Sequence, residues 1–98
     1  MRYEIVLTDT AQDHYRVLEA RWRAVVKAGI EVHLRHEPAK TSQSRIKRLR
    51  AMAHPEYRLR LDRYRVFYDV KGQTVVVLAI VPKDDVTKWL NVHGVKTS

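Results

Sequence analysis

Apolar positions near the N-terminus change from a two-residue to a helical spacing. Within residues 2–8, Tyr3, Ile5 and Leu7 alternate with other side chains, which predicts a short strand. Beyond it, apolar residues recur at steps of three and four positions: Ala11, Tyr15, Leu18, Trp22, Val25, Val26 and Ile30. This spacing fits one long helix or a helical hairpin bent near residues 19–21. Two short helices would cover a small sheet better, so we expect the hairpin.

A basic strand is predicted in the middle of the chain. Pro38 is expected to end the second helix. Residues 40–44 read as a polar connector, and residues 44–55 as weakly helical or extended. Apolar and polar residues then alternate strictly: Tyr57, Arg58, Leu59, Arg60, Leu61 and Asp62. Because successive side chains of a strand point to opposite faces, this strand has one apolar and one largely cationic face.

The rest of the pattern predicts a hairpin and a last helix. Residues 64–68 alternate again, and a glycine-containing turn separates them from residues 74–81, which are apolar at both parities and indicate a central strand. Residues 84–90 predict a terminal helix, and residues 92–98 a frayed tail. We therefore expect one α+β domain over residues 1–98. Its small, mainly antiparallel sheet of about four strands is covered on one face by the helical hairpin, and a short helix ends the chain.

The composition is that of a folded protein outside the membrane. Hydrophobic residues make up 45% of the 98 positions and charged residues 31%, which suffices for one core and differs from disordered chains. The absence of cysteine excludes disulfides, Cys-based zinc sites and thiol nucleophiles. The longest apolar run, residues 75–82, is too short to span a bilayer, and the N-terminus lacks the pattern of a secretory signal. We expect a cytoplasmic protein with no membrane partner.

The positive charge is concentrated in one quarter of the chain. Within residues 40–65, nine basic minus two acidic side chains give +7, against +8 for the whole sequence. The basic residues of this segment are Lys40, Arg45, Lys47, Arg48, Arg50, Arg58, Arg60, Arg63 and Arg65. Such a concentration favours a specific polyanionic partner, and RNA is the one we expect.

The basic strand presents a regular row of guanidinium groups. Arg58 and Arg60 share one face, about 7 Å apart along the strand, which is close to the phosphate spacing of an extended single strand of nucleic acid. If the next strand pairs with it as a hairpin, Arg65 joins that face, with Phe67 beside it as a stacking surface for a base. The alternative is a charged face that serves only solubility, but such a face normally mixes acidic and basic residues.

The histidines offer little evidence for a metal site. His14, His33 and His36 are the candidates, but His14 lies on a different turn and no carboxylate completes a helical ligand pair. The sequence also lacks a glycine-rich phosphate loop and a serine elbow motif. We therefore expect neither a metal nor a cofactor.

A family resemblance accompanies these features. The segment PEYRLRLDRYRVFYDV, followed by VVVLAIVPK and a last helix ending in WL, resembles the RelE/ParE superfamily of bacterial toxin–antitoxin toxins. The resemblance covers almost the whole chain, and residues 57–83 are its specific part. It implies the same fold and a cognate antitoxin that wraps the toxin. For the RelE-like branch it implies an mRNA endonuclease that acts in the ribosomal A site and so arrests translation and growth.

The resemblance also implies site residues. Arg58 and Arg60 match the two basic residues that bind and polarise the scissile phosphate, Arg65 matches the arginine of the family's YRLVY-like strand, and Lys83 matches the lysine after the last strand. Further contacts with RNA are expected from the rest of the basic segment and one aromatic residue: Arg45, Lys47, Arg48, Arg50, Arg63 and Phe67.

The chain departs from the RelE pattern at two positions. RelE-type members carry an arginine after the lysine and a tyrosine near the last helix, whereas this sequence has Asp84 and Leu90 there. The group that takes the proton from the attacking 2′-hydroxyl is therefore open between Lys83, His54, Asp84 and ribosomal RNA itself. Two alternative functions also stay open: a ParE-like toxin that inhibits DNA gyrase without cutting RNA, and a weakened toxin kept for regulation with its antitoxin.

Overall fold

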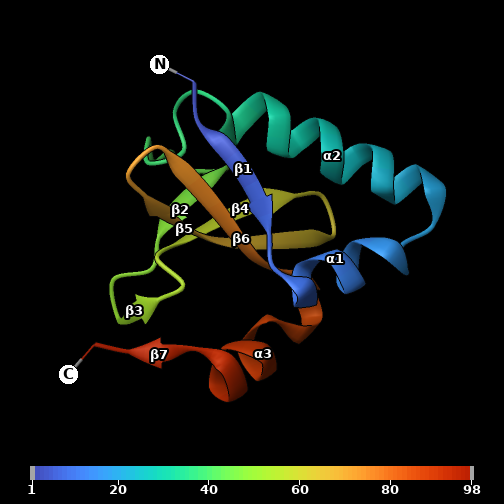
Figure 1. Cartoon of the computed structure of the whole chain (residues 1–98). Helices are drawn as coiled ribbons and strands as arrows, with labels where there is room; N and C mark the ends of the chain where they lie inside the picture. The colour runs from blue at the N-terminus through green and yellow to red at the C-terminus, as the bar shows by residue number, and fades with distance from the viewer. Residues whose placement is uncertain (1, 98) are drawn as a thin grey trace.

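The computed structural model describes residues 2–97 and has a five-stranded sheet at its centre (Figure 1). Across the sheet the strands are β1 (Glu4–Leu7), β6 (Thr74–Pro82), β5 (Tyr64–Lys71), β4 (Tyr57–Leu61) and β2 (Ile46–Arg48). β1 pairs with β6 in parallel, and the other three pairings are antiparallel. The predicted α+β fold with a mainly antiparallel sheet is confirmed.

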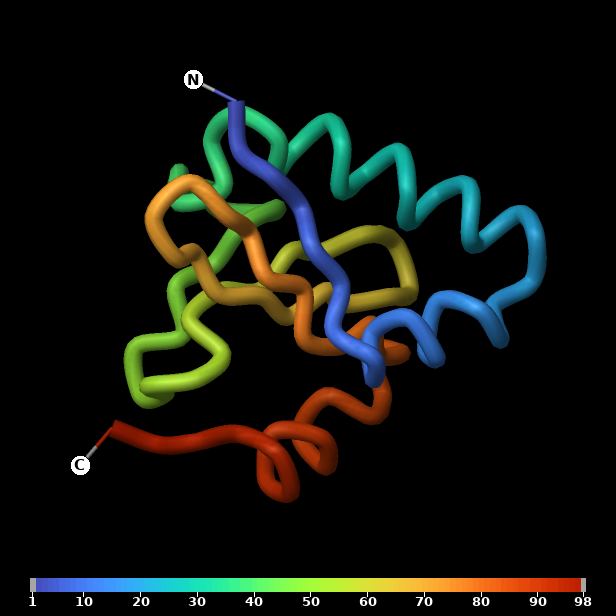
Figure 2. Tube along the Cα trace, in the orientation of Figure 1, coloured from blue at the N-terminus to red at the C-terminus, as the bar shows by residue number. Residues whose placement is uncertain are grey.

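The predicted helical hairpin is present. α1 (Asp9–Arg16) begins after Thr8, whose hydroxyl accepts a hydrogen bond from the Ala11 backbone N–H (3.2 Å), as an N-terminal cap does. α2 (Ala20–Leu34) follows a break at residues 17–19. In Figures 1 and 2 this hairpin lies on one side of the sheet, and the C-terminal segment, coloured red, lies on the other.

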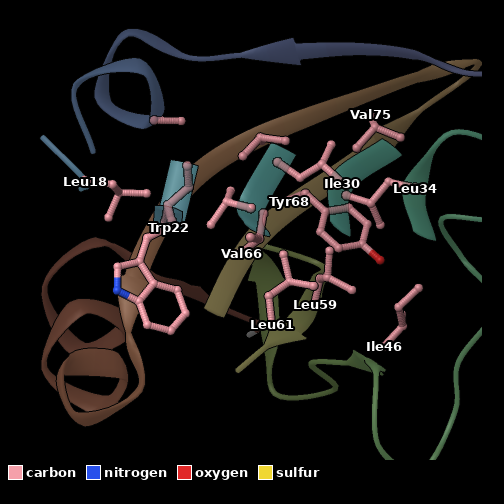
Figure 3. Packing of buried hydrophobic residues seen from close by; sticks show 14 residues of the cluster. Leu18, Trp22, Ile30, Leu34, Ile46, Leu59, Leu61, Val66, Tyr68 and Val75 are labelled. Carbon is pink, nitrogen blue, oxygen red and sulfur yellow. The ribbon is translucent and has the colours of Figure 1, made fainter. Parts of the chain in front are cut away.

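The main core fills the space between α2 and the sheet (Figure 3). α2 approaches β4 closely at Gly29, where a Cβ atom would come within 2.4 Å of a Leu61 methyl carbon. The buried side chains here come from both layers and include Trp22, Val26, Ile30, Leu34, Leu59, Leu61, Val66 and Tyr68. The apolar faces predicted for the helices and for β4 therefore meet one another.

Tyr68 ties this core to the segment after α2. Its ring is completely buried, its hydroxyl donates to the Pro38 carbonyl (2.6 Å), and burial raises the pKa of that hydroxyl. We predict that Tyr68→Phe lowers the free energy of unfolding by about 1–3 kcal/mol, because the Pro38 carbonyl loses its donor in a buried place. Urea denaturation measures the change, and unchanged stability would show that the bond contributes nothing.

A second, smaller apolar cluster lies on the other face of the sheet. β6 leads through a 3₁₀ turn (Lys83–Asp85) into α3 (Val86–His93), which places Trp89 over Phe67 with ring centroids 5.0 Å apart and planes 6° apart. The other members of the cluster are Ala79, Val81, Leu49, Val86 and Leu90. α3 thus covers the β5 and β6 half of this face.

A bulge in β6 lets one strand serve both clusters. Phe67 pairs with Ala79 and Tyr68 with Val77, so Leu78 is the extra residue. Val77 packs toward the helical hairpin, whereas Ala79 packs toward α3. This explains why the sequence of β6 is apolar at both parities.

Several short elements differ from the sequence expectation. The segment read as weakly helical or extended contains β2 and a further strand, β3 (Met52–His54), and the tail expected to fray contains β7 (Val95–Lys96), which pairs with β3. β2 adds the fifth strand to the sheet. α2 also ends at Leu34, before Pro38. None of the helices in residues 2–97 has the length and apolar character needed to cross a membrane.

Candidate nucleic-acid interface

The predicted row of cationic side chains forms on the face of the sheet opposite to α2. In the β4–β5 hairpin Arg60 lies opposite Arg65 and Arg58 opposite Phe67, and β2 places Lys47 opposite Arg58. Cross-strand partners share a face of the sheet. Arg58 and Arg60 therefore lie on the same face, as the alternation predicts, with Lys47 on one flank and Arg65 on the other.

No carboxylate neutralises these guanidinium groups within residues 2–97. The ion pairs recorded there join other residues: Arg16 with Asp13, Arg35 with Glu31, Lys40 with Glu37, and His54 with Asp69. Arg58 even has a buried Nε–H for which no protein group in the described chain accepts a hydrogen bond. Buried donors normally find an acceptor. The Nε–H of Arg58 is thus a donor without an acceptor among residues 2–97.

Arg58, Arg60 and Arg65 repel one another electrostatically. The pKa of Arg58 is lowered by burial and then by the charge of Arg60. The pKa of Arg65 is lowered by burial and by the charges of Arg58 and Arg60, against a weaker opposing effect of Asp62. Guanidinium groups remain protonated at neutral pH even so. A bound phosphate would relieve this repulsion, which favours anion binding.

The β4–β5 turn holds Arg65 in place. Its Nη1 donates to the backbone carbonyls of Asp62 (2.6 Å) and Tyr64 (3.0 Å). Asp62 has a positive φ of 55°, a conformation that asparagine and aspartate tolerate better than most residues. The guanidinium is therefore anchored to the turn by one nitrogen.

An open cleft lies beside this turn, where β6 ends. Its volume is about 630 Å³, and Arg60, Arg65, Lys83 and Asp84 are among the residues that line it. The backbone N–H of Lys83 donates to the Arg63 carbonyl (2.7 Å), which fixes the start of the 3₁₀ turn against the hairpin. The structure thus brings together three of the four residues expected to be catalytic, with Asp84, and Arg58 adjoins them on β4.

The other predicted RNA-binding cations divide into two groups. Lys47 and Arg50 are exposed on β2 and in the turn after it, and Arg45 is exposed where its Nη1 donates to the Arg60 carbonyl (3.0 Å). Arg48 faces the other way: it lies 5.4 Å from the centre of the Tyr57 ring and donates to the Glu56 carbonyl (2.8 Å). Arg63 lies 4.8 Å from the centre of the Trp22 ring. The last two guanidiniums are engaged within the protein.

Solved structures of toxin–antitoxin complexes share this architecture. The RelE–RelB complex from Pyrococcus horikoshii OT3 aligns with a TM-score of 0.69 and 21% identity, over 85% of this chain and 97% of that one. A chain of the RelBE2 toxin–antitoxin complex from Mycobacterium tuberculosis aligns with a TM-score of 0.69 and 26% identity, over 84% of this chain and 99% of that one. A chain of the RelB–RelE complex from Methanococcus jannaschii aligns with a TM-score of 0.66 and 18% identity, over 86% of this chain and 96% of that one. The protein has a RelE-like toxin fold. Neither a protein-family model nor a curated protein matches its sequence.

Phe67 is not exposed on the cationic face, so the expectation that its ring stacks on a base is wrong. Its ring is 0% exposed and lies under Trp89. Alternation does put it on the same face as Arg58, but on the half that α3 covers. The signal for this was in the last helix, since Val86, Trp89 and Leu90 form an apolar stripe that needs a partner on the sheet.

The two departures from the RelE pattern have distinct surroundings. Asp84 is exposed and lines the cleft beside Lys83. Leu90, where RelE-type members have a tyrosine, is half-buried against the second apolar cluster. An aliphatic side chain cannot transfer a proton, so Leu90 cannot take the role that the resemblance gives to that tyrosine.

His54 lies beside Asp69, toward the end of β5 away from the β4–β5 turn. Asp69 is a partner that the sequence analysis missed. His54 Nδ1 contacts Oδ2 of Asp69, a carboxylate that is only 2% exposed. The signal for Asp69 was a lone acidic residue inside the otherwise apolar β5. Within residues 2–97, no group of three or more His, Asp and Glu side chains is placed to hold a metal ion.

Proposed function

We propose that the protein is the toxin of a toxin–antitoxin pair and that it cuts mRNA on the ribosome, which arrests translation and growth. The observation that carries this proposal is the cluster of Arg58, Arg60 and Arg65 on one face, without a paired carboxylate in residues 2–97. Clustered arginines bind the phosphates of RNA strongly, whereas they add little to the stability of a fold. The substrate class is single-stranded RNA, and the compartment is the cytoplasm.

The arginines and Lys83 would act on the charge that develops during cleavage. Attack of the 2′-hydroxyl on the adjacent phosphate adds negative charge to the phosphoryl oxygens, and preorganised cations stabilise that charge. Arg58, whose Nε–H has no acceptor among residues 2–97, and Arg60 on the same face would bind the scissile phosphate. Arg65 and Lys83 border the cleft into which the RNA strand would continue. The ribosome would supply in-line geometry by holding the mRNA.

The proposed protein partner is an antitoxin with an acidic segment. The solved neighbours are complexes of a toxin with its antitoxin, and this chain carries a net charge of +8. Acidic side chains laid along the cationic row would neutralise it and exclude RNA. The antitoxin and mRNA would then compete for one surface.

Inhibition of DNA gyrase, as in ParE-like toxins, is the second candidate. Asp84 and Leu90 favour it, because they replace the arginine and tyrosine that RelE-type nucleases carry. The same two residues would suit a weakened toxin retained for regulation. Against both stands the unpaired arginine cluster, which a nuclease needs and the alternatives do not.

Primer extension on a translated mRNA distinguishes the nuclease, the gyrase inhibitor and the weakened toxin. We predict cuts inside codons after brief expression of the protein, and none on the same transcript with its start codon removed, because the ribosome presents the substrate. Intact mRNA together with loss of gyrase supercoiling activity would establish the second candidate instead. Intact mRNA with active gyrase would leave the weakened toxin.

A further inference from the structure

Asp69 is a buried carboxylate on β5, and both of its oxygens have partners. Its Oδ1 accepts a hydrogen bond from the Glu56 backbone N–H (2.8 Å), and its Oδ2 contacts His54 Nδ1. The Glu56 side chain in turn accepts a hydrogen bond from the Val70 backbone N–H through Oε1 (2.9 Å). Both oxygens of a buried carboxylate are thus occupied, and one of them is occupied by an imidazole.

This contact decides which nitrogen of His54 is free. With Nδ1 turned to the carboxylate, the neutral ring carries its proton on Nδ1, and the lone pair stays on Nε2. No protein partner for Nε2 is recorded within residues 2–97, and the His54 side chain is 43% exposed while that of Asp69 is 3% exposed. The ring therefore contacts the buried carboxylate through Nδ1, and part of its surface is open to solvent.

Asp69 and Arg58 lie on the same face of two neighbouring strands. Asp69 is two residues beyond Phe67 on β5, and Phe67 is the cross-strand partner of Arg58. Two residues along a strand return to the same face at a distance of about 7 Å. Asp69 therefore lies on the face that carries Arg58, beyond the Arg58–Phe67 pair in the direction away from the β4–β5 turn.

We propose that Asp69 is a positioning residue that orients His54 as the general base for cleavage of RNA. The inference rests on the proposed function. His54 Nε2 takes the proton of the 2′-hydroxyl as the 2′-oxygen forms its bond to phosphorus. The bond from phosphorus to the 5′-oxygen then breaks, and that oxygen takes a proton from water in the open cleft. The products are a 2′,3′-cyclic phosphate and a 5′-hydroxyl, and the imidazolium returns its proton to solvent.

The carboxylate has a defined part in this step. It keeps the proton on Nδ1 before the reaction and stabilises the imidazolium that forms during it, as in other carboxylate–histidine pairs. The pair also provides what Leu90 cannot, since a tyrosine is absent from that position. The competing interpretation is structural: the contact would only tie β3 to β5.

Two substitutions separate a positioning role from a structural one. His54→Gln removes the base from a half-exposed side chain, so the fold should persist. Asp69→Asn keeps an acceptor for the Glu56 N–H, but its amide donates to Nδ1 and so moves the ring proton to Nε2. His36→Gln is the matched control, because His36 is exposed in the segment after α2.

The measurement is single-turnover cleavage of a defined mRNA on purified ribosomes, at saturating protein and across pH 5–8. Wild-type cleavage should rise with pH, because a general base must be unprotonated to accept the proton. His54→Gln should lower the rate about 100- to 10,000-fold and remove that rise. Asp69→Asn should lower it comparably, and the double variant no further. His36→Gln should match wild type.

The pH profiles are compared between variants, because other charged groups also lie near His54. Besides Asp69 they are Glu56 before β4, Arg48, which bonds the Glu56 carbonyl, and Lys96 of β7. The profile of His54→Gln is therefore compared with that of wild type, since those groups are common to both. Affinity for a labelled single-stranded RNA should stay within about twofold in each variant, because binding rests on the arginines.

The outcomes are distinguishable from failure of the proposed function. If wild-type protein cuts mRNA and His54→Gln cuts it at the same rate, the base assignment is overturned and the nuclease stands. If both substitutions only lower the melting temperature and leave the rate and its pH dependence intact, the contact is structural. If wild-type protein does not cut, the nuclease and its base fall together.

Discussion

Replacing Arg58 and Arg60 together by alanine is expected to abolish mRNA cleavage and growth arrest while the protein stays folded. Each arginine would lose charge-assisted hydrogen bonds to phosphate worth about 1.5–3 kcal/mol. For two such contacts the dissociation constant for single-stranded RNA should rise by two to four orders of magnitude, on the order of 3–6 kcal/mol. Fluorescence anisotropy with a labelled RNA and growth after induction measure the two effects.

The salt dependence of binding adds a second, independent measure. Each cation that neutralises a phosphate contributes about −0.7 to the slope of log affinity against log salt for single strands. The double variant should therefore have a slope shallower by about 1.4. An equal drop in affinity with an unchanged slope would mean that the two arginines act through the fold and do not touch phosphate.

The expectation that the fold persists follows from the surroundings of the two side chains. Arg60 is exposed, and Arg58 is half-buried with an Nε–H that has no protein acceptor. Truncation loses some packing of the aliphatic stems but also relieves repulsion between like charges. We expect the free energy of unfolding to change by less than about 1 kcal/mol.

A control with the same loss of charge tests location. Arg16→Ala with Lys27→Ala also removes two positive charges, but from α1 and α2, and both side chains are exposed. These helices cover the opposite face of the sheet, so RNA affinity should fall little. If the control weakened binding as much as the loss of Arg58 and Arg60, net charge and not the arranged row would be responsible.

Strict periodicity made part of this interface readable from sequence. The two-residue alternation of β4 fixes which face each side chain occupies, so the shared face of Arg58 and Arg60 could be predicted before any pairing was known. The helical spacing before residue 34 likewise predicted the layer that buries the other face. Local repeats over five or more residues suffice for such inferences.

Non-local contacts account for what the sequence did not reveal. β2, β3 and β7 have two or three residues each, too few to show a period, and they exist because distant strands pair with them. Asp69 acquires its significance only when β3 brings His54 beside it. Alternation assigned Phe67 to the correct face, but whether a face is bare or covered depends on where α3 packs. Sequence therefore indicated the direction of a side chain better than its exposure.

Phe67→Ala is expected to be the most destabilising substitution on the cationic side of the sheet. The ring is fully buried and stacked on Trp89, and removal of a buried phenylalanine costs about 3–5 kcal/mol. Total stabilities of proteins this size are about 5–15 kcal/mol, so the variant should be partly unfolded or should release α3. Urea denaturation followed by tryptophan fluorescence reports on both, because Trp89 is half of the stacked pair.

Phe67→Leu separates this packing role from base stacking. Leucine keeps most of the apolar volume, so we expect a stability loss of about 1–2 kcal/mol. Stacking of a base on an aromatic ring is worth about 1–3 kcal/mol, and that part of the affinity would vanish in Phe67→Leu if RNA reached the ring. Because α3 covers Phe67, we expect the folded variant to bind RNA within twofold of wild type.

Trp89→Leu completes the test from the other side of the stack. It should destabilise the protein by an amount similar to Phe67→Leu, and the double variant by less than the sum, since both changes break the same contact. Additive stability effects would mean that the two rings act independently. A fall in RNA affinity at full folding, in either single variant, would instead mean that α3 moves aside and that the aromatic pair belongs to the interface after all.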